Sequence, residues 1–142
     1  MKKIIMILMI ITIIFSSISM CFASEVKMNE DQTPWYVVTN KYNATFSINN
    51  SGMANISCGL TPKATSTIDE VTMRFVVKNI SGSIVFDKTY DAVWSSLRGQ
   101  YISSDTYQLK KRGTYSCTIT MKCYKNDDLL ETITSSTLTD TY

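Results

Sequence analysis

Apolar and polar residues alternate along most of the chain after residue 35, with a period of two residues. Successive side chains of a β-strand point to opposite faces, so each such segment has one apolar and one mostly solvated face. The pattern is clearest in 53–60, 69–79 and 113–124. The apolar positions that we expect to be buried are Ala54, Ile56, Cys58 and Leu60, then Val71, Met73, Phe75 and Val77, and finally Tyr115, Cys117, Ile119, Met121 and Cys123.

Short polar segments separate the alternating ones, as hairpin turns do. Three such turns are expected at 50–52, 81–82 and 125–128. The complete pattern predicts seven or eight short strands, which indicates an all-β fold built as an antiparallel β-sandwich. The predicted strands are 35–40, 44–49, 53–60, 69–79, 83–90, 100–109, 113–124 and 128–139.

The beginning of the chain follows a different pattern. Two lysines precede an apolar run over 4–15, and the small side chains of Cys21 and Ala23 occupy the −3 and −1 positions of a signal-peptidase site. An apolar helix of this length spans about 18 Å, which is shorter than the ~30 Å hydrocarbon core of a bilayer. We therefore predict a signal-peptide helix over 1–23 that is cleaved between Ala23 and Ser24.

Two alternatives stay open for this first segment: an uncleaved membrane anchor over 4–23, and a lipoprotein that is acylated on Cys21. The polar residues 24–34 end in a proline and are expected to form a flexible leader, followed by one domain over 35–142. We expect no wall-sorting segment after Tyr142. The predicted location is therefore the medium or the cell envelope.

Charge and residue types narrow the possible functions. Loss of the two signal lysines leaves twelve basic against twelve acidic residues, and a near-neutral chain is poorly suited to nucleic acid. The chain contains no histidine, which removes histidine-based nucleophiles and metal sites. The carboxylate pairs 69–70 and 127–128 are expected on solvated turns and not facing each other across a cleft. We therefore predict no enzyme activity, no cofactor and no metal.

Three cysteines remain after signal cleavage. Cys117 and Cys123 lie six residues apart on one predicted strand, or about 20 Å, whereas a disulfide needs Cα atoms within about 7 Å. At most one bridge is possible within the chain, from Cys58 to Cys117 or to Cys123. We favour Cys58–Cys117, which would join two central strands across the core and close a long loop, worth roughly 4 kcal/mol. Cys123 is then the free cysteine, either buried or available for an intermolecular link. The alternative is three reduced, buried thiols.

The letters GTYSC at 113–117 resemble the G-x-Y-x-C signature of immunoglobulin-like domains. The resemblance implies an immunoglobulin-like sandwich in which Tyr115 is the corner tyrosine, and Cys58 and Cys117 are the bridged pair of cysteines. The pattern departs from the signature on the predicted strand 69–79, where Met73 and Phe75 lie in place of a core tryptophan.

Residues 40–142 also resemble small exported proteins of clostridia-like Gram-positive bacteria, which form a family of unknown function. The resemblance is carried by RGTY at 112–115, YK at 124–125, ETITS at 131–135 and the final TY. It implies export from a bacterial cell and supplies no activity.

Export, a near-neutral sandwich and the lack of catalytic groups predict a non-catalytic binding or interaction module. Its expected partner is an unknown protein or glycan; we expect no nucleic acid, and no stable membrane insertion after cleavage. Thr114, Ser116, Thr118 and Thr120 form a hydroxyl row on one predicted face, which is a candidate surface for glycans or another ordered lattice. The alternatives are a structural component of the cell surface, assembled through Cys123 or an edge strand, and a small carboxylate-based hydrolase or its accessory.

Overall fold

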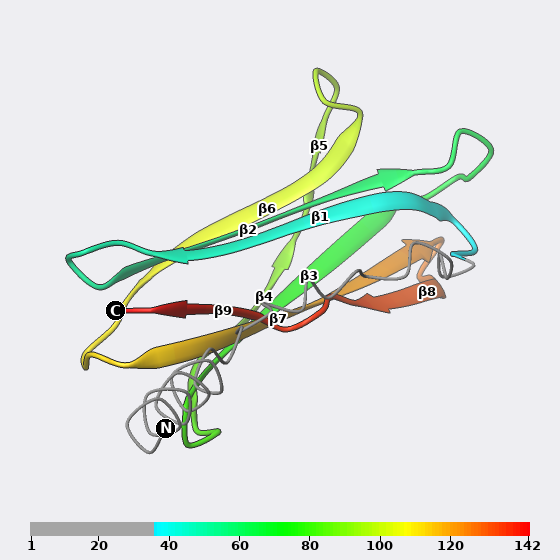
Figure 1. The fold of residues 1–142 in the computed structure, drawn as a ribbon. Coiled ribbons are helices and arrows are strands. Elements are labelled where there is room, and N and C mark those ends of the chain that lie inside the picture. The colour runs from blue at the N-terminus through cyan, green and yellow to red at the C-terminus, as the bar shows by residue number, and fades with distance from the viewer. Residues whose placement is uncertain (1–35) are drawn as a thin grey trace, which may run out of the picture. The chain divides into compact units, whose positions relative to one another are not determined.

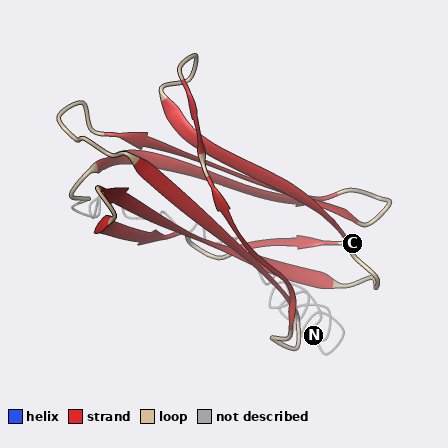
Figure 2. Ribbon diagram, turned by 180° about the vertical axis from the view of Figure 1, so that it is seen from behind, coloured by secondary structure: helices blue, strands red, loops and turns tan. Residues whose placement is uncertain are grey.

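The computed structural model describes residues 36–142, and this part of the chain consists of strands, turns and loops (Figure 2). The expected signal-peptide helix, its cleavage between Ala23 and Ser24 and the leader over 24–34 lie outside the described residues. Within 36–142 there is no helix long and apolar enough to cross a membrane.

Nine strands within the described residues form two antiparallel sheets in two layers (Figure 1). The first sheet has the order β1-β2-β6-β5, and the second has the order β4-β3-β7-β8, with β9 also paired to β7. The strands of the first sheet are β1 (Thr39–Ile48), β2 (Met53–Pro62), β5 (Val93–Ser95) and β6 (Gln100–Gln108). Those of the second are β3 (Glu70–Asn79), β4 (Ile84–Asp91), β7 (Thr114–Lys125), β8 (Asp128–Thr134) and β9 (Leu138–Thr141).

The core lies between the two sheets and is built from the three apolar faces that the alternation predicts. All thirteen of those side chains are at most 5% exposed, and they come from β2 in one sheet and from β3 and β7 in the other. Burying a side chain such as Phe75 or Ile119 stabilises the fold by roughly 1.5–3 kcal/mol. The prediction of an all-β sandwich with antiparallel strands is therefore confirmed.

The predicted turns also connect the expected strands. The turn after β7 places Asn126 and Asp127 at positive φ, 50° and 68°, as a two-residue hairpin turn of the primed type requires. Gly52 and Gly82 have φ near 80° in the turns after β1 and β3, a conformation that glycine adopts without steric cost.

Three strand boundaries differ from the prediction. In place of the two expected strands 35–40 and 44–49 there is one strand, β1. Its register shifts between Thr39 and Lys41, and Tyr42 and Ala44 then continue the core-facing alternation. The expected strand 128–139 is two, β8 and β9, separated near Ser135. There the backbone N–H of Ser135 donates to the Ile119 oxygen at 2.8 Å, and the Ser135 hydroxyl accepts from the Ile119 N–H at 3.0 Å.

The third difference is β5, a strand of only three residues that the pattern does not reveal. The chain passes from β4 in the second sheet to β5 in the first at Ala92, so β5 pairs with the beginning of β6 alone. The rest of β6, from Ser103 onward, has no second strand neighbour in its sheet. Because β5 is so short, one edge of β6 stays unpaired next to β4, and the candidate site begins there.

Side chains close this open side of the sandwich. The rings of Phe86 and Tyr107 pack with their centroids 5.1 Å apart, and the Tyr90 hydroxyl donates a hydrogen bond to Asp105. Asp105 also accepts the N–H of Thr106 at 2.7 Å, which satisfies a backbone donor near the open edge. Such shielding makes an edge strand less able to pair with another chain.

Candidate functional site

The outer face of the first sheet has a gap in its side chains at Gly59, in the interior of β2. Gly59 pairs with Asn43 of β1 and with Ile102 of β6, and Gln100 lies two residues before Ile102. A Cβ atom at residue 59 would lie 2.5 Å from Asn43 Oδ1 and 2.7 Å from Gln100 Oε1. The glycine therefore allows two amide groups, one from each flanking strand, to fold over β2 toward each other.

These amides keep hydrogen-bonding capacity for a ligand. Each carries an oxygen acceptor and an NH₂ group with two donors, and Gly59 has no side chain to engage them. Two positions along β2 on the same face, the Thr61 hydroxyl is buried without a hydrogen-bond partner among the described residues.

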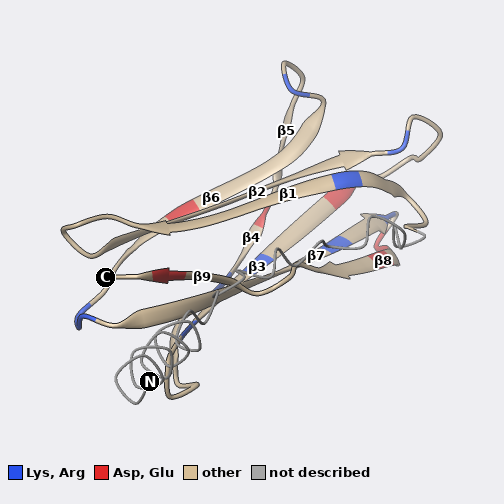
Figure 3. Cartoon of the chain, in the orientation of Figure 1, with Lys and Arg blue, Asp and Glu red and all other residues tan. Residues whose placement is uncertain are grey.

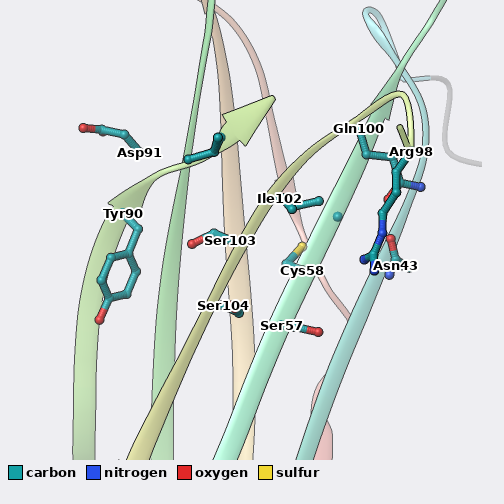
Figure 4. Close-up of a pocket in the computed structure, with 12 residues that line it drawn as sticks. Asn43, Ser57, Cys58, Tyr90, Asp91, Arg98, Gln100, Ile102, Ser103 and Ser104 are labelled. Carbon is teal, nitrogen blue, oxygen red and sulfur yellow. The ribbon is translucent and has the colours of Figure 1, made fainter. Parts of the chain in front are cut away.

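Two adjoining cavities run over this face, and we call them together the Gly59 groove. The first has a volume of about 430 Å³ and the second about 450 Å³, and both have Ser57 and Ser104 in their walls. Ligand-binding cavities in proteins measure roughly 300–1,000 Å³, so each is of suitable size. Figure 4 shows the first cavity, with Arg98, Gln100 and Asn43 gathered on one side, and Tyr90 and Asp91 on the other.

The walls of the groove are mainly polar and uncharged. Thr45 and Ser57 face each other across β1 and β2, with their hydroxyl oxygens 2.7 Å apart. Beside them runs a short apolar strip: Val93 of β5, which is 69% exposed, pairs with Ile102 of β6. The other polar residues of the second cavity are Ser47, Asn55, Ser104 and Thr106.

Charged groups lie at the margins of the groove. Arg98 and Asp91 line the first cavity, and Asp105 lines the second with its carboxylate already engaged by Tyr90 and Thr106. Burial, followed by the hydrogen bond to Asp105, raises the pKa of Tyr90 to about 12, so its phenol remains a protonated donor near neutral pH. Figure 3 shows acidic and basic residues interspersed along both sheets.

The predicted cysteine bridge is not present in the structure. Cys58, Cys117 and Cys123 are buried free thiols, which is the arrangement of the alternative prediction. Cys58 Sγ contacts Met121 Sδ at 3.4 Å, and Met121 lies four residues beyond Cys117 along β7, about 13 Å of strand.

All three thiols are chemically protected. Burial raises the pKa of Cys58 to about 12 and that of Cys117 to about 11, so both stay protonated and unreactive near neutral pH. Cys123 is fully buried, with Thr39 Oγ1 at 3.9 Å from its sulfur, and burial raises its pKa as well. Of the two roles expected for this cysteine, the structure has the buried one.

The other sequence candidates lie away from the groove. The hydroxyl row from Thr114 to Thr120 lies on the outer face of the second sheet, where Thr118 and Thr120 pair with residues of β3. The acidic pairs are exposed at turns, where Asp69 accepts the N–H of Asn126 at 3.0 Å. Residues 36–142 bring together no group of three or more side chains suited to hold a metal ion.

Sequence reasoning missed the residues that make the groove, namely Asn43, Gly59, Gln100 and Arg98. One signal was present, because a lone glycine inside a strand pattern marks a close approach of other groups to the backbone. No protein-family model matches the chain, and no curated protein matches it.

Proposed function

We propose that this protein is an exported, non-catalytic binding module of the immunoglobulin-like type, and that its ligand lies in the Gly59 groove. The observation that carries the proposal is the pair of amides, from Asn43 and Gln100, folded over a glycine in the interior of β2. A strand interior gains stability from a side chain, and a glycine there is useful where another group must approach the backbone closely.

The order of the strands supports the immunoglobulin-like type. The sheets β1-β2-β6-β5 and β4-β3-β7-β8 correspond to strands A-B-E-D and C′-C-F-G of such a domain. The Tyr115 hydroxyl donates to the Lys111 carbonyl oxygen at 2.7 Å, which is the contact of a corner tyrosine. The domain departs from antibody-type members of the fold in its free thiols and in Phe75, which is buried in β3.

Export is supported by the signal-peptide pattern of residues 1–23 and by the resemblance to small exported bacterial proteins. The site of action is then the medium or the cell envelope. A near-neutral mature chain favours a protein or glycan ligand over nucleic acid. The absence of histidine from the whole chain and the engaged carboxylate of Asp105 favour binding without turnover.

The proposal is tested by binding assays on the protein recovered from cells that express the full chain. Labelled protein is applied to an array of glycans and to an array of extended peptides, beside the variant Gly59→Val. We expect retention on one array and its loss in the variant, with every array compound recovered unchanged. Retention that Gly59→Val leaves intact would place the ligand elsewhere, and cleavage of any compound would show that the module is catalytic.

A structural role in surface assembly is the second candidate, favoured by the exposed end of the β5–β6 hairpin. Leu97 is 95% exposed in this turn, and Val93 is 69% exposed beside it. Assembly through this hairpin predicts that the sedimentation coefficient rises with protein concentration and that Leu97→Ser abolishes the rise. Ile80→Ser, at a position of the β3–β4 turn that is 86% exposed, is the control.

A further inference from the structure

We propose that the Gly59 groove binds a neutral oligosaccharide chain, with the sugar hydroxyls held by the side chains of β1, β2 and β6. This inference rests on the proposed function and gives its ligand a chemical class. Four features of the groove support it: its place in the sheet, its hydrogen-bonding groups, its apolar strip and its charge.

The place of the groove disfavours an extended peptide. Peptides that bind β-sheets add as a strand along an open edge, where unpaired backbone groups receive them. The groove instead runs over β2, which pairs with β1 on one side and β6 on the other along nearly its full length. The backbone N–H and C=O groups of β2 are already used by these neighbours. The open edge of β6 beside the groove is covered by the Tyr90–Asp105 and Phe86–Tyr107 contacts, so a ligand is left mainly with side chains.

Those side chains suit a ligand with many hydroxyl groups. Asn43 and Gln100 each offer an acceptor and two donors, so one amide can bind two neighbouring hydroxyls of a sugar ring. Ser57 and Thr45 form a mutual hydrogen bond that leaves each oxygen able to accept another.

The apolar strip and the length of the groove suit sugar rings joined in a chain. Val93 and Ile102 pair on this face, and they offer an apolar surface to the C–H face of a ring. From Gly59 in the first cavity to Asn55 in the second, the groove follows four residues of β2, or about 13 Å. A chain of rings can therefore lie along the strand.

The charges that line the groove favour a neutral chain over an acidic one. Arg98 and Asp91 both line the first cavity, so an anion attracted by one is repelled by the other. A polyanion would need a row of cations to hold it, and among the described residues that line the groove there is a single one, Arg98.

The test is a titration of the isotopically labelled secreted protein, followed by the backbone amide signals of β1, β2 and β6. The probes are neutral linear tetrasaccharides of glucose, N-acetylglucosamine, xylose and mannose. A tetrasaccharide of galacturonic acid and an extended neutral peptide serve as comparators. Three variants accompany the native chain: Gly59→Val, the double variant Asn43→Ala/Gln100→Ala, and Thr118→Val on the hydroxyl row as the matched control.

We expect at least one neutral tetrasaccharide to shift signals around Gly59. Gly59→Val should weaken its binding about tenfold or more, because the added side chain displaces the amides of Asn43 and Gln100. The double variant should have an effect of similar size, because it removes both amides and so two or more hydrogen bonds to the sugar. Thr118→Val should leave the affinity unchanged. The melting temperature and spectrum of each variant verify that it is folded, so a loss of binding is not mistaken for unfolding.

Other outcomes overturn the inference in distinguishable ways. Tighter binding of the acidic tetrasaccharide or of the peptide in the groove would refute the neutral sugar and leave the binding module standing. Sugar-induced shifts confined to the hydroxyl row of β7 would refute the groove as the site. No shift with any neutral sugar at millimolar concentration would refute the ligand class, and hydrolysis of a probe would also refute the proposed function.

Discussion

Tyr115, near the start of β7, donates a hydrogen bond from its hydroxyl to the carbonyl oxygen of Lys111 at 2.7 Å. The ring is 5% exposed and belongs to the core, so this bond ties the loop before β7 to the body of the sandwich. The loop contains three consecutive basic residues over 110–112, whose mutual repulsion would otherwise favour a more open path. The contact holds together the junction at which the chain crosses between the sheets.

Replacing Tyr115 by Phe should remove this bond and keep the packing of the ring. We expect a loss of about 1 kcal/mol in the free energy of unfolding, the usual net value of one hydrogen bond. Urea unfolding of the two proteins measures the difference, with an unchanged slope against urea concentration. Tyr124→Phe is the control, because no hydrogen bond is described for the Tyr124 hydroxyl; an equal loss there would show that the Lys111 contact is not the cause.

The oxidation state of the core cysteines is a second prediction. The protein unfolded without reducing agent should take up one alkyl group on each of Cys58, Cys117 and Cys123. A disulfide between the first two would leave only Cys123 to react, and tandem mass spectrometry of the peptides separates these cases. The folded protein should react slowly, since all three thiols are buried.

The same thiols should make the fold sensitive to alkaline pH. The pKa of Cys58 is raised on folding to about 12 and that of Cys117 to about 11, both by burial. A thiol whose pKa is raised on folding stabilises the folded state fully at pH values below its pKa in the unfolded chain, about 8.5 for cysteine. This stabilisation is lost as the pH rises toward the pKa of the folded state. We expect the free energy of unfolding to fall above about pH 8.5, and Cys58→Ala to reduce the slope. A pH-independent stability in this range would contradict free thiols.

How far the sequence predicts the fold depends on which interactions set each element. The alternation around Ile56, Phe75 and Ile119 predicts the buried faces correctly, because burial of apolar side chains is a property of each strand by itself. The split near Ser135 and the three-residue β5 depend on contacts with Ile119 and with β6, which lie far away in sequence. Such long-range contacts cannot be predicted from the local alternation of apolar and polar residues.

The candidate site is harder to predict for the same reason. Asn43 and Gln100 are fifty-seven residues apart, and they meet only because β1 and β6 both pair with β2. In the sequence, Gly59 occupies a polar position of the alternation and fits a solvated strand face. What distinguishes it is the pair of amides above it, which only the arrangement of three strands supplies.

Acid should weaken a contact between the sheets. Asp140 of β9 accepts the N–H of Ile48 at 2.6 Å and that of Thr141 at 2.8 Å, and these bonds lower its pKa. A carboxylate with a lowered pKa stabilises the fold at pH values above the pKa it has in the unfolded chain, about 3.9 for aspartate. This stabilisation is lost as the pH falls through the lower pKa of the folded state. We expect Asp140→Asn to lower stability near neutral pH and to have less effect below about pH 4. The neighbouring Thr139→Ala should show no such pH dependence in urea unfolding.

The contacts of Glu131 with residues 37–39 should control how readily this first described segment detaches from β8. The Glu131 carboxylate of β8 accepts N–H bonds from Val37, Val38 and Thr39, at 2.5, 3.3 and 3.1 Å. Glu131→Gln should weaken these bonds, and hydrogen exchange of the three amides should become faster, while the amides of β7 keep their protection. The neighbouring variant Thr132→Val is the control. Equal acceleration in both variants would mean that the carboxylate does not hold this segment.

Replacing Gly59 by alanine should affect the stability of β2 and the binding of a ligand in opposite directions. The backbone at Gly59 has no positive φ, so alanine fits there, and it would reduce the freedom of the unfolded chain. The only crowding is with the ends of two flexible side chains, Asn43 and Gln100, which can turn away. Gly59→Ala should therefore raise the free energy of unfolding by about 0.4–1 kcal/mol, as measured in urea, while it weakens binding in the groove. A marked loss of stability would show that the amides are needed for folding, and that the glycine serves the sheet instead of a ligand.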